Sequence, residues 1–244
     1  MKSILDIQYG KLPEQILDVH LPDCDEFPVF IYFHGGGIEE GGKGLSDHIK
    51  EYFTSNGIAL VSADYRMYPT ARFPDYIIDA AKAVKWVQNN MSQYGKVTHT
   101  FIGGASAGAY ISMMLCFNKF FLANEGVNPY LITGYIHDAG QPTTHFNVLR
   151  ERGIDSRRVI VDEAAPLYHI CAEGEYPRML FIVSDHDMPG RYEQTRLVLA
   201  TLKDFGKSGY DIIEMHGTHC AYVKAVDENG DSVFGKMVFN YIKK

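Results

Sequence analysis

The chain has 244 residues, of which 46% are hydrophobic and 22% are charged, and its formal net charge is −7. This length and composition are typical of a globular protein with a sizeable core, and the acidic balance argues against a nucleic-acid or anionic-membrane partner. The four cysteines are scattered without a C-x-x-C pair, which indicates reduced thiols rather than a disulfide framework. No apolar run reaches the length of a membrane span and no signal-peptide pattern opens the chain, so we expect a cytoplasmic protein.

Strand patterns alternate with helix patterns along the chain. Residues 4–9 and 15–20 alternate apolar and polar side chains, as an antiparallel hairpin at the edge of a sheet does. Continuous apolar runs, typical of strands covered on both faces, occupy residues 29–33, 58–62, 100–102, 131–136 and 179–183. Apolar residues at helical spacing predict helices at residues 75–91, 107–117, 191–205 and 233–242. The alternation predicts an α/β fold with a mainly parallel, doubly wound sheet.

No linker, internal repeat or low-complexity segment divides the chain, so we expect residues 1–244 to form a single domain. The irregular stretch 141–174 lies between two predicted strands, and we interpret it as a short lid or wall over the strand ends. Ligands of such sheets bind outside the carboxyl ends of the strands. The residues that directly follow the strands are therefore the candidates for a site: 35–37, 106, 138, 185–187 and 216–219.

The pentapeptide Gly-Ala-Ser-Ala-Gly at residues 104–108 has the form Gly-x-Ser-x-Gly, between an apolar strand and an apolar helix. In this context the serine sits on a sharp strand-to-helix turn that projects its hydroxyl from the sheet. The flanking residues must be small, because strand and helix nearly touch at the turn. The pattern therefore makes Ser106 the candidate nucleophile, with the N–H groups of the following helix directed at an oxygen beside it.

The motif His-Gly-Gly-Gly at residues 34–37 directly follows an apolar strand. Three glycines let backbone N–H groups approach a ligand without obstruction by a Cβ atom, as an oxyanion hole requires. A phosphate-binding loop is the alternative, but Lys43 is followed by a glycine where such a loop carries a Ser or Thr hydroxyl. Together with Ser106, the motif favours the oxyanion hole.

These motifs occur with Asp-Tyr-Arg-Met-Tyr-Pro at 64–69, Phe-Pro at 73–74 and Asp79, in an order typical of one family. The chain resembles α/β-hydrolase-fold esterases, the subgroup with the hormone-sensitive-lipase-like carboxylesterases and the bacterial acetyl and feruloyl esterases. The resemblance extends from residue 34 to the C-terminus. It implies a three-layer fold whose mostly parallel, eight-stranded sheet carries helices on both faces.

The resemblance also implies roles for residues around the glycine motif. Gly36, Gly37 and Ala107 are expected to supply the N–H groups of the oxyanion hole, while Asp64 and Arg66 brace the glycine loop. Ile38 stands where many members carry an aromatic residue. We expect the pocket walls to include Ile38, Tyr68, Phe73, Tyr110, His145 and Phe146.

The acid and then the base of a triad should follow the serine in chain order. Asp185 and Asp187 both lie just beyond a predicted strand, and the family spacing from Ser184 favours Asp187 as the acid. His216 and His219 come after the last predicted strand. We favour His219 as the base, because it matches the family's Gly-x-x-His spacing, and we interpret His216 as a packed or wall residue.

A metal site built from these same acids and histidines is an alternative to the triad. No H-E-x-x-H or similar helical spacing is present, and a metal would leave the glycine motif and the serine turn unexplained. We therefore expect neither a metal nor a cofactor.

The predicted function is hydrolysis of small acyl esters, acetyl-like, by Ser106, His219 and Asp187 through an acyl-enzyme intermediate. An amidase, including a formamidase, or a peptidase uses the same groups, and a non-catalytic ligand-binding homologue keeps the same pocket. The expected partner is a small-molecule ester, with no nucleic acid and no membrane. The oligomeric state stays open, with a homodimer among the alternatives.

Overall fold

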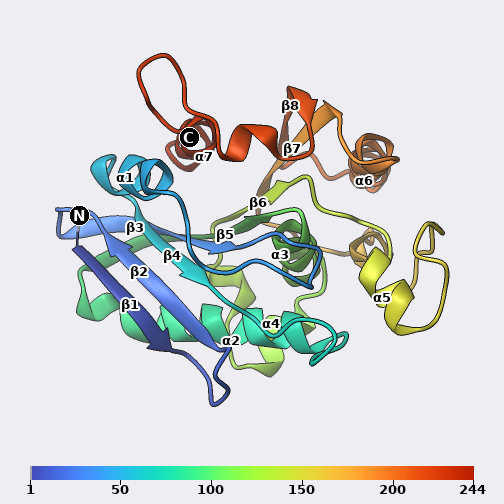
Figure 1. The fold of residues 1–244 in the computed structure, drawn as a ribbon, viewed down its shortest axis with the longest axis horizontal. Helices are drawn as coiled ribbons and strands as arrows, with labels where there is room; N and C mark the ends of the chain where they lie inside the picture. Colours follow the sequence, from blue (N-terminus) through green and yellow to red (C-terminus); the bar gives the residue numbers. More distant parts are fainter. Residues whose placement is uncertain (1) are drawn as a thin grey trace.

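Residues 2–244 are described by a computed structural model, in which eight strands form one sheet in the order β1-β2-β4-β3-β5-β6-β7-β8 (Figure 1). The edge hairpin β1–β2 is antiparallel, β2 also pairs antiparallel with β4, and the pairs from β4 to β8 are parallel. The strands are β1 (Lys2–Gln8), β2 (Ile16–Leu21), β3 (Glu26–Phe33), β4 (Ala59–Ala63), β5 (Lys96–Ala105), β6 (Gly134–Asp138), β7 (Arg178–His186) and β8 (Tyr210–Thr218).

Helices cover both faces of the sheet, and Figure 1 shows α1 and α7 on one side with α2 and α4 on the other. This is the three-layer α/β arrangement that the resemblance to α/β-hydrolase-fold esterases implies. The α-helices are α1 (Asp47–Ser55), α2 (Asp75–Asn90), α3 (Ala107–Phe117), α4 (Phe120–Asn124), α5 (Phe146–Glu151), α6 (Arg191–Asp204) and α7 (Val233–Ile242). The 3₁₀ turns are η1 (Met91–Gln93), η2 (Pro129–Leu131), η3 (Pro166–His169) and η4 (Ala221–Val223).

The apolar run in β3 is explained by the burial of both faces of this strand. Successive side chains of a strand point to opposite faces. Val29 and Ile31 accordingly join the core cluster beneath α2, α3 and α6, while Phe30 and Tyr32 join the cluster beneath α1 and α7. Because helices cover both faces, both sets of side chains are excluded from water, and an apolar residue is favourable at each position.

Three strand predictions needed correction. The strand predicted at residues 100–102 extends over the whole of β5, Lys96–Ala105. The predicted strand 131–136 begins only at Gly134, because Pro129 starts a 3₁₀ turn that leaves Leu131 62% exposed. The last strand runs further than predicted, through Thr218, so that His216 lies within β8 rather than after it. The short helices α1, α4 and α5 were not predicted, since too few turns are present to establish a helical period.

The stretch 141–174 is a packed wall of the molecule rather than a loose lid. It contains α5 and η3, and its backbone is tied together by hydrogen bonds from Thr144 N to Ile160 O (2.9 Å) and from Leu167 N to Pro142 O (2.9 Å). Near the start of α5, the side-chain amide of Asn147 donates to the carbonyl of Gly37 at 2.9 Å. The wall therefore helps to position the glycine loop.

None of the helices within residues 2–244 has both the length and the apolar character needed to cross a bilayer.

Candidate active site

Ser106 occupies the sharp turn between β5 and α3. Its backbone has φ +55° and ψ −113°, a conformation in the positive-φ region that non-glycine residues rarely adopt. A hydrogen bond from Ser106 N to Asp138 O (2.7 Å) ties the turn to β6. A Cβ atom on Gly108 would lie 1.9 Å from the carbonyl oxygen of Phe33, which explains why the turn requires a glycine there. The local strain is a feature of catalytic turns and places the serine hydroxyl above the sheet.

The structure brings the three predicted triad residues together. Nε2 of His219 lies 2.8 Å from the Oγ of Ser106, and Nδ1 of the same ring lies 2.5 Å from Oδ1 of Asp187. The three side chains come from the carboxyl ends of β5, β7 and β8, at one edge of the sheet. They form the serine–imidazole–carboxylate line in which a base can take the hydroxyl proton while the acid fixes its tautomer.

The carboxylate of Asp187 is held in its charged form despite its burial. The side chain is 0% exposed, and it accepts a second hydrogen bond from the backbone N–H of Met188 at 2.7 Å. Burial works to raise the pKa of Asp187, but the hydrogen bond and charge of His219, with the Met188 N–H and the nearby Arg191, together lower it below the usual range. The group is therefore suited to stabilise an imidazolium at His219.

Asp185 and His216 lie together but away from this line. The Nδ1 atom of His216 is 2.7 Å from Oδ2 of Asp185, and the backbone N–H of Gly217 donates to Oδ1 at 2.9 Å. These contacts, with one from His186, hold the pKa of Asp185 well below its usual range. The interpretation of His216 as a packed or wall residue was wrong: the side chain is 86% exposed, because it lies on the open edge strand β8.

The glycine loop after β3 has the backbone that only glycine adopts readily. Gly36 and Gly37 have φ values of +111° and +63°, and a Cβ atom on Gly36 would lie 1.9 Å from the carbonyl oxygen of Glu40. Asp64 braces the far end of the loop, since its Oδ1 accepts from the backbone N–H of Lys43 at 2.5 Å. The loop lines the same cavity as Ser106, as the predicted oxyanion hole requires.

Arg66 does not brace this loop, contrary to the prediction. Its guanidinium binds the fully buried Asp79 through Nε at 2.7 Å and Nη2 at 2.9 Å, and Gln15 donates to the same carboxylate at 2.6 Å. These bonds satisfy a buried charge that would be costly to leave unpaired. The Arg66–Asp79 pair therefore anchors α2 to the loop that follows β4.

His34, at the start of the glycine motif, is a structural residue. Its ring stacks on Tyr65 with centroids 4.4 Å apart, and its Nδ1 lies 2.6 Å from the carbonyl oxygen of Gly35. Burial lowers the pKa of His34, although Gly35 and Asp64 partly oppose this effect, so the ring is neutral near pH 7. It can hold the loop without contributing a charge to the site.

A cavity of about 1120 Å³ opens beside Ser106 and His219. The expected walls were mostly wrong: Ile38, Tyr110 and His145 are at most 1% exposed and belong to the core, and neither Tyr68 nor Phe73 lines the cavity. Of the expected set only Phe146 does. The other side chains around the opening are Tyr32, His34, Glu39, Glu40, Ala105, Met188, Cys220, Ala221, Val223 and Lys224.

Several of these residues carry no signal in the sequence. Met188 follows the triad acid by one position and Val223 follows the triad base by four. This closeness in sequence is the only indication that they line the cavity. Lys224 is an ordinary surface residue by sequence. Tyr32 lies in an apolar run that is otherwise typical of core residues.

Asp138 ends β6 beneath the site and was among the candidate positions. Its side chain is 0% exposed and accepts a hydrogen bond from the hydroxyl of Tyr222. Burial raises the pKa of Asp138 to about 8, opposed by the Tyr222 hydrogen bond and aided by the charge of Asp187. Asp138 does not line the cavity, so its side chain supports the site from below rather than contacting a ligand.

Comparisons with known proteins find sequence similarity to esterases. The BD-FAE family model matches residues 17–130, a range that includes the glycine loop and Ser106. Carboxylesterase NlhH of Mycobacterium tuberculosis is 34% identical over 113 residues, covering 45% of this chain and 35% of the relative. Esterase LipQ of the same species is 25% identical over 241 residues, covering 89% of this chain and 56% of the relative. The chain thus spans about a third to about half of the length of these relatives.

Among solved structures, a truncated carbohydrate esterase from gut microbiota superposes with a TM-score of 0.81 at 18% identity, covering 100% of this chain and 95% of that one. At this identity the match establishes the fold. The sequence similarity to carboxylesterases is consistent with the strand order and with the strained serine turn. The chain is an α/β-hydrolase-fold protein homologous to carboxylesterases.

Proposed function

We propose that the protein is a serine carboxylesterase that hydrolyses small acyl esters through an acyl-enzyme intermediate. In this mechanism His219 takes the proton from the Ser106 hydroxyl as the oxygen attacks the ester carbonyl. Asp187 keeps Nδ1 of the imidazole protonated and stabilises the imidazolium. His219 then protonates the leaving alcohol, and water resolves the acyl-enzyme by the same route. The observation that carries the proposal is the hydrogen-bonded line Ser106–His219–Asp187.

The tetrahedral intermediate needs donors at the place where the negative charge develops. We assign this role to the backbone N–H groups of Gly36, Gly37 and Ala107. The first two lie on the loop that lines the cavity beside Ser106, and Ala107 is the first residue of α3, whose N-terminal N–H groups are unpaired within the helix. Each such donor contributes on the order of 3–4 kcal/mol to lowering the barrier.

Two features support a small acyl group on a bulkier alcohol. The side chains of Ile38, Tyr110 and His145 fill the protein interior around the site instead of opening a channel for a long acyl chain. The open cavity is partly polar, with Glu39, Glu40 and Lys224 on its lining, which suits a polar alcohol. Arg150 pairs with Glu39, so the local negative charge is partly neutralised.

The test is turnover of p-nitrophenyl acetate, followed by longer p-nitrophenyl esters. We expect kcat/KM to fall as the acyl chain lengthens beyond about four carbons, and labelling by a fluorophosphonate to occur at Ser106. A protein that binds esters without turnover and resists the fluorophosphonate would be a ligand-binding homologue instead. Matched ester and amide substrates separate an esterase from an amidase, a formamidase or a peptidase.

The proposal also includes a cytoplasmic location and a small-molecule ester as the partner, without nucleic acid or membrane. The four free cysteines, Cys24, Cys116, Cys171 and Cys220, suit a reducing compartment. The net charge of −7 disfavours anionic surfaces as partners.

A further inference from the structure

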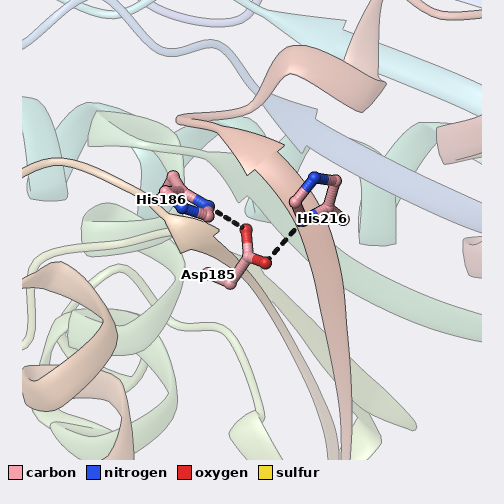
Figure 2. A group of neighbouring side chains, drawn as sticks. All are labelled: Asp185, His186 and His216. Carbon is pink, nitrogen blue, oxygen red and sulfur yellow. Dashed lines mark hydrogen bonds and ion pairs between the residues drawn. The ribbon is translucent and has the colours of Figure 1, made fainter.

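A second group of acid and histidine side chains lies on the surface, outside the Ser106 line. Asp185 is flanked by two imidazoles, and Figure 2 shows its carboxylate between the rings of His186 and His216. Nδ1 of each ring lies 2.7 Å from a different oxygen of this carboxylate. The two rings are nearly perpendicular, with an interplanar angle of 89° and centroids 5.5 Å apart.

This cluster is separate from the triad, although the two are close in sequence. Asp187 binds His219, and His219 binds Ser106, while Asp185 binds His186, His216 and the Gly217 N–H. The side chain of Asp187 is 0% exposed, whereas those of His186 and His216 are 69% and 86% exposed. The cluster therefore faces solvent, and a ligand bound to it would not contact the triad.

We propose that Asp185, His186 and His216 form a surface site for a divalent transition-metal ion such as Zn²⁺. One donor atom from each of the three residues lies within 4.8 Å of the other two. Zinc binds histidine nitrogen and carboxylate oxygen at about 2.0–2.2 Å in a tetrahedral arrangement, so two of its ligand atoms lie roughly 3.3–3.6 Å apart. Closing the cluster onto an ion therefore requires shifts of up to about 1.5 Å, which small rotations of exposed side chains can make.

The donor set identifies the class of ion. Two imidazoles and one carboxylate suit Zn²⁺, Ni²⁺, Co²⁺ or Cu²⁺, whereas Ca²⁺ and Mg²⁺ prefer oxygen ligands alone. Three protein ligands leave at least one coordination position for water. A neutral imidazole can carry its proton on either ring nitrogen, so a shift of the proton to Nε2 turns each Nδ1 from a donor to Asp185 into a metal ligand. The metal then pairs with the Asp185 charge in place of these N–H groups.

The site joins the ends of two neighbouring strands. His186 is the last residue of β7 and pairs in the sheet with Thr218, the last residue of β8. The Ser184 hydroxyl also donates to the Thr218 carbonyl at 2.9 Å. A metal held by Asp185, His186 and His216 would therefore clamp the segments that carry the triad acid and base. Because an ion bound only to the folded state stabilises it, metal binding should raise Tm.

The test uses untagged protein stripped of metals with a chelator and titrated with ZnCl₂ near neutral pH by isothermal calorimetry. We expect one Zn²⁺ per chain and a rise in Tm with Zn²⁺ concentration. His186→Ala and His216→Ala should each weaken binding by about tenfold or more, and the double variant should lose the Tm rise. His99→Ala removes an exposed histidine of β5 outside the cluster and should bind Zn²⁺ like the wild type.

His219→Ala separates the cluster from the triad, whose imidazole is a competing candidate for Zn²⁺ binding. This variant should keep the stoichiometry and affinity of the wild type. Circular dichroism without metal checks that each variant is folded, and substitution with Co²⁺ gives a visible spectrum that reports imidazole ligands directly. The proposal is overturned if the cluster variants bind Zn²⁺ as tightly as the wild type, or if His219→Ala alone abolishes binding.

Discussion

The Nε2 atom of His219 lies 2.8 Å from the Oγ of Ser106, although 113 residues separate the two in the chain. The contact arises because β5 and β8 end at the same edge of the sheet, and the loop after each strand turns toward the other. The geometry brings base and nucleophile within hydrogen-bonding distance before any substrate binds.

Replacement of the nucleophile is the most direct test of the proposed function. Ser106→Ala should lower kcat for p-nitrophenyl acetate by at least about 10⁴-fold, because no other group in the line can attack the carbonyl. The far-ultraviolet spectrum and Tm should stay near those of the wild type.

Ser112→Ala is a matched control for the nucleophile variant. Ser112 lies on the same helix α3, and its Oγ is also 2.8 Å from a histidine, Nδ1 of His137, but this pair is buried in the core and has no carboxylate partner. Its loss should leave turnover within a few fold of the wild type. Equal activity in the Ser106 and Ser112 variants would contradict the assignment of Ser106.

The two candidate acids can be separated by amide substitution. Asp187→Asn should lower kcat by about 10³–10⁴-fold, because the amide cannot hold the productive tautomer of His219. Asp185→Asn, measured without added metal, should cost far less, since this carboxylate contacts His186, His216 and Gly217 but not His219. Steady-state kinetics on one ester decide the matter, and a larger loss in the Asp185 variant would reassign the acid.

A substitution in the glycine loop should reduce the stabilisation of the transition state. In Gly36→Ala the new Cβ would meet the Glu40 carbonyl oxygen, so the loop must move and its N–H groups leave their positions. We expect kcat to fall by about 10²-fold or more with a smaller change in KM. Gly209→Ala is the control, because nothing lies within 4 Å of its added methyl group and Gly209 does not line the cavity. Activity near the wild-type level in Gly36→Ala would argue against the oxyanion role.

The buried Asp138 predicts a pH dependence of stability. Its pKa is raised to about 8 in the folded protein, mainly by burial, against about 3.9 in an unfolded chain. Between these values the folded state binds the extra proton, so this group's contribution to stability is fully present below about pH 4 and is lost as the pH rises through about 8. The slope is at most about 1.4 kcal/mol per pH unit.

Asp138→Asn removes this titration and keeps an oxygen that accepts from Tyr222. Tm of the wild type should therefore fall more than Tm of the variant between about pH 6 and about pH 9. The exposed Asp23→Asn serves as the control, whose pH profile should follow that of the wild type. Parallel profiles for the wild type and Asp138→Asn would show that Asp138 does not carry the effect.

The features of this protein that could be predicted from its sequence are those that have local physical causes. Continuous apolar runs are forced on strands covered by helices on both faces, which is why β3 and β7 were recognisable. The turn at Ser106 needs small neighbours for steric reasons, so its motif identified the nucleophile directly. The motif also implied that the acid and then the base follow the serine in the chain, which restricted the search to residues after Ser106.

Tertiary structure alone decided the rest, because it depends on the direction of each side chain. His216 and His219 are three residues apart, yet one lies on the exposed edge strand and the other turns inward to Ser106. The Asp185 pairing with His216 joins residues 31 apart and has no signature in either segment. The cavity wall likewise came from Phe146, Met188 and Val223 rather than from Tyr110, since the packing of helices and loops sets which side chains reach the opening.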